Sequence, residues 1–156
     1  MINKEINGDL VKLALNNKFD AIIHGCNCFN TMGKGIAYTI RKVFPEAYEA
    51  DKKTKKGDRN KLGDYSYAAL NIKQKELFII NAYTQYDYRI TSQKSINVDY
   101  EAIRKVFTRI NKDFKGLHIG IPRIGAGLAG GDWDKIKTII NEVTPDIDIT
   151  LVNYSG

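Results

Sequence analysis

Short apolar runs alternate with segments of helical periodicity along this chain. The apolar runs have the length of buried strands and cover residues 1–6, 21–24, 65–70, 77–83, 117–122 and 148–153. Between them, apolar residues recur at helical spacing in residues 10–15, 35–43 and 97–114, and in a last segment that begins after Asp132. Strands that alternate with helices in this way predict an α/β sandwich with a mostly parallel, buried sheet.

Breaks in the pattern predict where elements end. Pro45 is expected to close the helix over residues 35–43. The polar residues 71–76 are expected to form the turn between two strands. No repeat or linker interrupts the pattern, so we expect residues 1–156 to form a single domain.

Composition narrows the class of protein. Of 156 residues, 43% are hydrophobic and 27% are charged, which is typical of a folded domain rather than a disordered chain. Two cysteines, Cys26 and Cys28, are too few for a disulfide scaffold. The sequence shows neither a membrane-length apolar run nor a signal peptide. These features predict a reducing, cytoplasmic setting and no membrane partner.

One segment carries most of the net charge of +6. Residues 52–61 contain six basic residues and one acidic residue, which leaves +5 in this stretch. The stretch is either a solvated connector between two elements or a phosphate-binding patch. The connector is favoured, because no aromatic residues are interleaved with the charges to stack on nucleic-acid bases.

Two glycine-rich segments carry the strongest chemical signal. Residues 24–38 and 122–133 each lead from a predicted strand into a predicted helix, which is where ligands bind in sheets of this kind. Glycine lets the backbone approach a ligand closely, and the free N–H groups of a helix start attract anions. We therefore expect a phosphate-bearing ligand, although neither segment contains a Walker motif or a dinucleotide-binding motif.

These motifs, in this order, resemble the macro domain family of ADP-ribose-binding modules. The resemblance rests on Gly8-Asp9-Leu10, on H-G-C-N and M-G-K-G-I-A within residues 24–38, on N-A-Y-T-Q at 81–85, and on I-P-R-I-G-A-G-L-A-G-G-D-W at 121–133. Within the family, the chain is most similar to the group of yeast-type ADP-ribose 1″-phosphate phosphatases and their bacterial and phage relatives. The resemblance implies a three-layer α/β/α fold with a central mixed, mostly parallel sheet.

The resemblance also implies a role for each matching residue. Asp9 is expected to accept a hydrogen bond from the adenine amino group beside Leu10, and Asn153 to lie near the adenine. Asn27 is expected to hold the distal ribose. The residues expected to line the distal ribose and the diphosphate are Gly33, Lys34, Gly35 and Ile36. Those expected to wrap the diphosphate are Gly125, Ala126, Gly127, Leu128 and Ala129.

Three residues are candidates for catalysis: His24, Asn27 and Asp132. His24 is either a proton donor beside the terminal phosphate or a hydrogen-bonded histidine at a strand end. A metal site of His24 with the two cysteines is disfavoured, because the chain offers too few further ligands. Asp132 precedes a helical pattern, and a role as its N-cap is favoured over catalysis. No metal or cofactor is expected.

The resemblance implies an enzyme that hydrolyses ADP-ribose 1″-phosphate to ADP-ribose and phosphate. The alternative is a module that binds ADP-ribose or a related nucleotide without turnover, or that removes ADP-ribose from a carrier. The related enzymes that cleave ADP-ribose from glutamate use a lysine and a late-loop aspartate, and Ala129 stands at that loop position. We expect ADP-ribose or its 1″-phosphate as partner, a monomer, and no nucleic acid.

Overall fold

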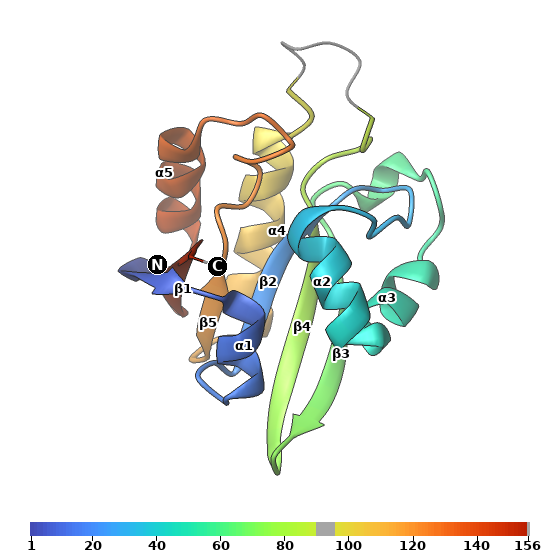
Figure 1. The fold of residues 1–156 in the computed structure, drawn as a ribbon. Helices are drawn as coiled ribbons and strands as arrows, with labels where there is room; N and C mark the ends of the chain where they lie inside the picture. The colour runs from blue at the N-terminus through green and yellow to red at the C-terminus, as the bar shows by residue number, and fades with distance from the viewer. Residues whose placement is uncertain (90–95, 156) are drawn as a thin grey trace.

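The computed structural model describes residues 1–89 and 96–155 of the chain. Its strands are β1 (Ile2–Gly8), β2 (Ala21–Cys26), β3 (Tyr65–Ile72), β4 (Lys75–Tyr83), β5 (His118–Ile121) and β6 (Asp148–Tyr154). They form one sheet in the order β1-β6-β5-β2-β4-β3. Only the β3–β4 pair is antiparallel among the named strands (Figure 1). The predicted mixed, mostly parallel sheet is confirmed.

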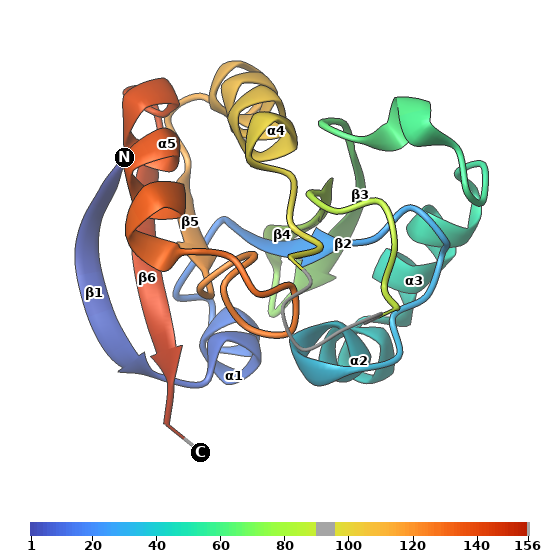
Figure 2. The ribbon, with the colours of Figure 1, turned by 90° about the horizontal axis from the view of Figure 1, so that it is seen from above.

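Helices cover both faces of the sheet. They are α1 (Leu10–Leu15), α2 (Gly35–Val43), α3 (Pro45–Lys52), α4 (Tyr100–Asp113) and α5 (Trp133–Val143), with a 3-10 turn, η1 (Arg59–Lys61). Figure 2 shows α4 and α5 on one face and α1, α2 and α3 on the other. Consecutive residues of β2 serve the two cores, because Ile22 packs with the α1–α3 side and Ile23 with the α4–α5 side. The three-layer fold is therefore confirmed.

The region after α2 differs from its prediction. The helix does end before Pro45, but that proline opens a further helix, α3, which the sparse apolar pattern did not predict. Proline suits the first helical position, because its fixed φ is helical and its missing N–H is not needed there. The basic stretch after α3 is also more than a solvated connector, because Lys61 is buried.

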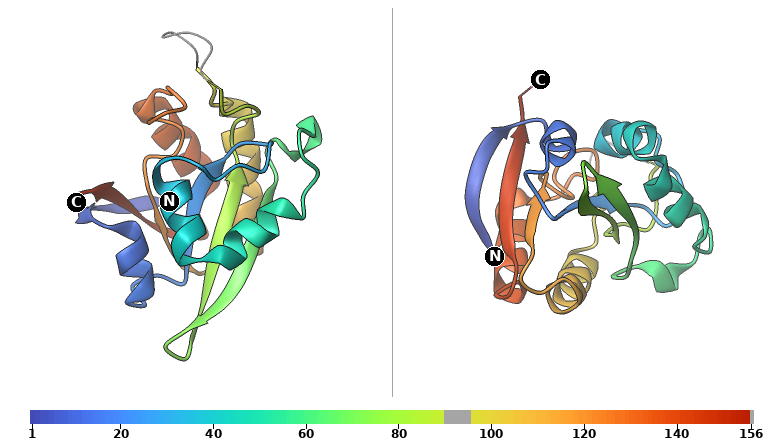
Figure 3. Two further views of the ribbon diagram at one scale, coloured as in Figure 1. Left: turned by 45° about the vertical axis from the view of Figure 1, so that its right-hand side comes forward. Right: turned by 90° about the horizontal axis from the view of Figure 1, so that it is seen from below.

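The β3–β4 hairpin has a tighter turn than predicted. Lys73 and Gln74 alone connect the strands, with φ angles of 52° and 68°. The strands therefore extend into the predicted turn, and the hairpin projects beyond the rest of the sheet (Figure 3). Within residues 1–89 and 96–155, no helix combines the length and the apolar character of a membrane span.

Candidate functional site

The parallel strands end along one edge of the sheet, and the loops that leave this edge enclose two adjoining cavities. The first cavity has a volume of about 500 Å³ and the second about 450 Å³. Four residues line both of them: Gly35, Ile36, Pro122 and Arg123. The two cavities therefore form one elongated cleft between the start of α2 and the loop after β5.

The first cavity lies where β1 meets α1 and where β6 ends. It is largely apolar, with Leu10, Val11 and Val152 in its wall and Asp9 and Asn153 as polar groups. Asp9 caps α1 by accepting a hydrogen bond from the Lys12 N–H through Oδ1 at 3.1 Å. Its Oδ2 accepts none from any described residue. This cavity suits a flat, apolar ring that carries a hydrogen-bond donor.

Asn153 is held in place from both sides. Its Oδ1 accepts a hydrogen bond from Arg123 Nε at 2.9 Å, and its Nδ2 donates to Glu5 Oε2 at 3.0 Å. The Arg123 guanidinium is thereby fixed at the junction of the two cavities. Arg123 belongs to the late glycine-rich motif but was not among the predicted site residues. It places a positive charge midway along the cleft.

The start of α2 forms one wall of the second cavity. Lys34 occupies the N-cap position, and its side chain makes no capping hydrogen bond. Gly35 has a φ of 60°, which favours glycine. The first backbone N–H groups of a helix have no partner within the helix. Gly35, Ile36 and Ala37 line the cavity, so their N–H groups are available to an anion there.

The loop after β5 forms the opposite wall. Four of its N–H groups bond within the loop, namely those of Ile124, Ala126, Gly130 and Gly131. Four more N–H groups of the loop donate to no described residue, and they belong to Gly125, Gly127, Leu128 and Ala129. All four of these residues line the second cavity. Both walls thus present unpaired N–H donors, an arrangement that binds phosphate oxygens.

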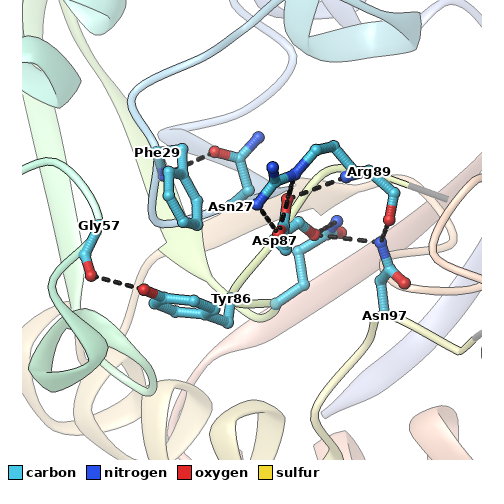
Figure 4. A network of polar contacts seen from close by, with 8 residues as sticks. Asn27, Phe29, Gly57, Tyr86, Asp87, Arg89 and Asn97 are labelled. Atoms are coloured by element: carbon cyan, nitrogen blue, oxygen red, sulfur yellow. Dashed lines mark hydrogen bonds and ion pairs between the residues drawn. The ribbon is translucent and has the colours of Figure 1, made fainter. Parts of the chain in front are cut away.

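Asn27 reaches the second cavity from the loop after β2. Its Nδ2 donates to Thr31 Oγ1 at 2.7 Å. Its Oδ1 accepts from the Phe29 N–H at 2.8 Å, as Figure 4 shows. Lys61 also holds this loop in place, because its Nζ donates a hydrogen bond to the Cys28 carbonyl at 3.1 Å. The amide of Asn27 is therefore fixed before any ligand arrives.

His24 does not reach the cleft, and its predicted catalytic role is not supported. The side chain is 0% exposed and does not line either cavity. Its Nε2 lies 2.6 Å from Asn81 Oδ1 on the neighbouring strand β4. Burial lowers the pKa of His24 to about 4, so the ring is neutral at physiological pH. The histidine is a buried, hydrogen-bonded group at a strand end.

Two further predicted residues lie outside the cavity lining. Asp132 caps α5, where its carboxylate accepts from the Asp134 and Lys135 N–H groups, so the N-cap interpretation is confirmed. Ala126 packs against the α4–α5 core instead of facing the second cavity. Every other predicted ligand-binding residue lines one of the two cavities. Their contacts with a ligand stay predictions.

Thr31, Gln85 and Tyr88 were not among the predicted site residues. All three line the second cavity. Gln85 and Tyr88 follow β4, the strand beside β2, so only the strand order brings them to the cleft. N-A-Y-T-Q at 81–85 could have indicated Gln85, whereas no sequence motif marks Tyr88.

The cysteines are buried and not activated. Burial raises the pKa of both thiols, that of Cys28 to about 11, so neither is a thiolate at neutral pH. Among the described residues, no three or more His, Cys, Asp and Glu side chains gather as metal ligands. The acid–base groups that line the second cavity are Cys26, Lys34, Tyr88 and Arg123. The second cavity can therefore orient and stabilise an anion, but its lining offers no carboxylate or imidazole as a base.

Comparisons with known proteins agree with this geometry. An uncharacterized 17.5 kDa protein from the tk-vs intergenic region of Enterobacteria phage T4 is 37% identical over 99% of this chain and 97% of its own length. The DNA ADP-ribosyl glycohydrolase of Mycobacterium tuberculosis is 26% identical over 88% of this chain but only 39% of its own length. The ADP-ribose 1″-phosphate phosphatase of Candida albicans is 25% identical over 88% of this chain and 90% of its own length.

Solved structures share the fold. A crystal structure of a protein from Bacteroides thetaiotaomicron is 25% identical, with a TM-score of 0.75 over 98% of this chain and 99% of that one. Thermosipho africanus DarTG in complex with ADP-ribose is 15% identical, with a TM-score of 0.68 over 97% of this chain and 42% of that one. The family model for the Macro domain matches residues 23–140. The chain therefore belongs to the macro domain family.

Proposed function

We propose that the cleft binds ADP-ribose. The adenine occupies the first cavity beside Asp9 and Asn153, and the distal ribose occupies the second cavity beside Asn27. The observation that carries this proposal is the pair of facing walls with unpaired N–H donors, between which a diphosphate fits. Arg123 at the junction adds a positive charge near the same position.

The relatives support a hydrolase of ADP-ribose derivatives. Two of them are an ADP-ribose 1″-phosphate phosphatase and a DNA ADP-ribosyl glycohydrolase. The chain spans only 39% of the glycohydrolase but 90% of the phosphatase. We therefore propose that the chain hydrolyses ADP-ribose 1″-phosphate to ADP-ribose and phosphate.

The proposed reaction depends on positioning and charge stabilisation. A water attacks the phosphorus of the 1″-phosphate, the bond from phosphorus to the ribose oxygen breaks, and that oxygen takes up a proton. Such transition states are loose and need little help from a base, which suits a cavity lined without carboxylate or imidazole. The N–H groups of Gly127 and Leu128, with the ammonium of Lys34, would stabilise the phosphoryl oxygens. The Oδ1 of Asn27 has a second lone pair with which to orient the water.

Release of inorganic phosphate from ADP-ribose 1″-phosphate tests this activity, with ADP-ribose binding measured in parallel. The proposal predicts phosphate release by the wild type and a strong loss in Asn27→Ala. The variant Asp132→Asn, in which the altered residue lies outside the cleft, is the control and keeps its activity. Binding of ADP-ribose without any phosphate release would favour a non-catalytic binding module and would overturn the phosphatase proposal.

A further inference from the structure

The two cavities of the cleft share one polar side chain, that of Arg123. The other shared residues are Gly35, Ile36 and Pro122, whose side chains offer no hydrogen-bonding group. With adenine in the first cavity and the diphosphate in the second, the adenosine ribose that joins them lies at this junction. Of the four shared residues, Arg123 alone has a side chain that can bond to the hydroxyl groups of that ribose.

Residues from three neighbouring strands fix the position of this guanidinium. Glu5 lies on β1, Asn153 on β6 and Arg123 in the loop after β5, and these strands are adjacent in the sheet. The Glu5 carboxylate only accepts hydrogen bonds, so it takes the Nδ2 donor of Asn153 and turns Oδ1 towards Arg123. Oδ1 then accepts from Arg123 Nε at 2.9 Å. The guanidinium is thus oriented before a ligand binds.

Most of the hydrogen-bonding capacity of Arg123 is unused. Its Nε is bonded to Asn153, but neither Nη atom donates to another described residue. No acidic side chain among the described residues forms an ion pair with it, whereas Arg109, for example, pairs with Asp64. Arg123 is also exposed, so a ligand at the mouth of the cleft can reach it directly.

The chemistry of this position favours a phosphate over a free hydroxyl group. A hydroxyl leaves the charge of the guanidinium uncompensated, whereas a phosphate neutralises it and offers oxygens to both Nη groups. The diphosphate already has the unpaired N–H donors of the two walls. We propose that Arg123 binds a phosphate on the 2′ or 3′ oxygen of the adenosine ribose, and that the preferred ligands of the cleft are ADP-ribose derivatives phosphorylated there. This rests on the proposed binding of ADP-ribose.

Isothermal titration calorimetry with ADP-ribose and with its 2′-phosphorylated and 3′-phosphorylated derivatives tests this recognition. One of the two phosphorylated ligands is expected to bind at least about tenfold more tightly than ADP-ribose, because it gains hydrogen bonds between charged partners. The ligand that shows the gain identifies the phosphorylated oxygen. The gain should decrease as the salt concentration rises, because Arg123 is exposed to solvent.

The ratio of the affinity for the phosphorylated ligand to that for ADP-ribose is compared between variants. In Arg123→Gln this ratio should fall to about one, because the partner of the added phosphate is lost. If Arg123 served the diphosphate alone, both affinities would fall together and the ratio would stay as in the wild type. Arg41→Gln is the matched control, because Arg41 is exposed on α2 and lines neither cavity. It removes the same charge and should keep the ratio of the wild type.

Titration with unmodified ADP-ribose separates this inference from the proposed function. Binding of ADP-ribose without a gain from either phosphate would overturn the inference and leave the proposed function standing. The same holds if the ratio is unchanged in Arg123→Gln, or if it falls equally in Arg123→Gln and Arg41→Gln. Absence of binding by all three ligands would instead contradict the proposed function, and this inference with it.

Discussion

The buried histidine predicts how the stability of the protein depends on pH. Burial lowers the pKa of His24 to about 4 in the folded state, against about 6.5 in an unfolded chain. The unfolded state therefore binds the proton more tightly. Because the unfolded state takes up the proton first, the free energy of unfolding is highest above about pH 6.5. It decreases as the pH falls from about 6.5 to about 4. At about 1.4 kcal/mol per pKa unit, the full difference is about 3 kcal/mol, and about 2 kcal/mol is lost by pH 5.

Urea unfolding at pH 7 and pH 5 measures this loss in the wild type and in His24→Gln. The glutamine cannot titrate and retains an N–H donor for Asn81 Oδ1, the partner of His24 in the structure. The wild type should lose about 2 kcal/mol more than the variant between the two pH values, because other titrating groups contribute equally to both. Equal losses would show that His24 is not held neutral by burial. ADP-ribose affinity should be unchanged in the variant, because His24 lines neither cavity.

Four further substitutions test individual parts of the structure. Gly125→Ala should destabilise the fold by about 1–3 kcal/mol in urea unfolding, because Gly125 has a φ of 77° and a Cβ there would lie 2.7 Å from Val98. Gly127→Ala should have little effect on stability, since a Cβ meets no atom within 4 Å there. Lys61→Met should cost about 1–3 kcal/mol in the same assay, because it removes the hydrogen bonds that the buried ammonium donates to the Cys28 carbonyl and to Asn30 Oδ1, and a neutral result would contradict the role of Lys61 in fixing the loop after β2. Asp132→Ala should lower the free energy of unfolding by about 1 kcal/mol, because α5 loses its N-cap, and should leave ADP-ribose affinity unchanged. A large loss of affinity would show that Asp132 contributes to the ligand site.

Periodicity predicted most of the fold because most of the elements bury a regular apolar face. It did not predict α3, in which only Ala47 and Asp51 are buried, so no apolar stripe marks the helix. The run of charges over residues 52–61 favoured a solvated connector, which would leave Lys61 exposed. The burial of that lysine depends on acceptors at Cys28 and Asn30, which are distant in sequence and which only the folded loop brings near.

The cleft was largely predictable, because its lining comes from loops that directly follow predicted strands. The orientation of single side chains was not. His24 stands one residue before Gly25, which does line the second cavity, yet the histidine points at Asn81 within the sheet. The contribution of Tyr88 depends on the strand order, which places β4 beside β2 and is not encoded in any local motif.

Isothermal titration with ADP-ribose, using paired substitutions at Gly127, tests the central claim most directly. Gly127 lies in the late glycine-rich loop where a side chain meets no neighbouring atom, so both variants should fold. The account predicts one ADP-ribose per chain in the wild type. Gly127→Asp should bind at least about tenfold more weakly than Gly127→Asn, because only the aspartate repels the diphosphate. No binding by the wild type, or equal affinity in the two variants, would contradict a diphosphate held between the two walls of the cleft.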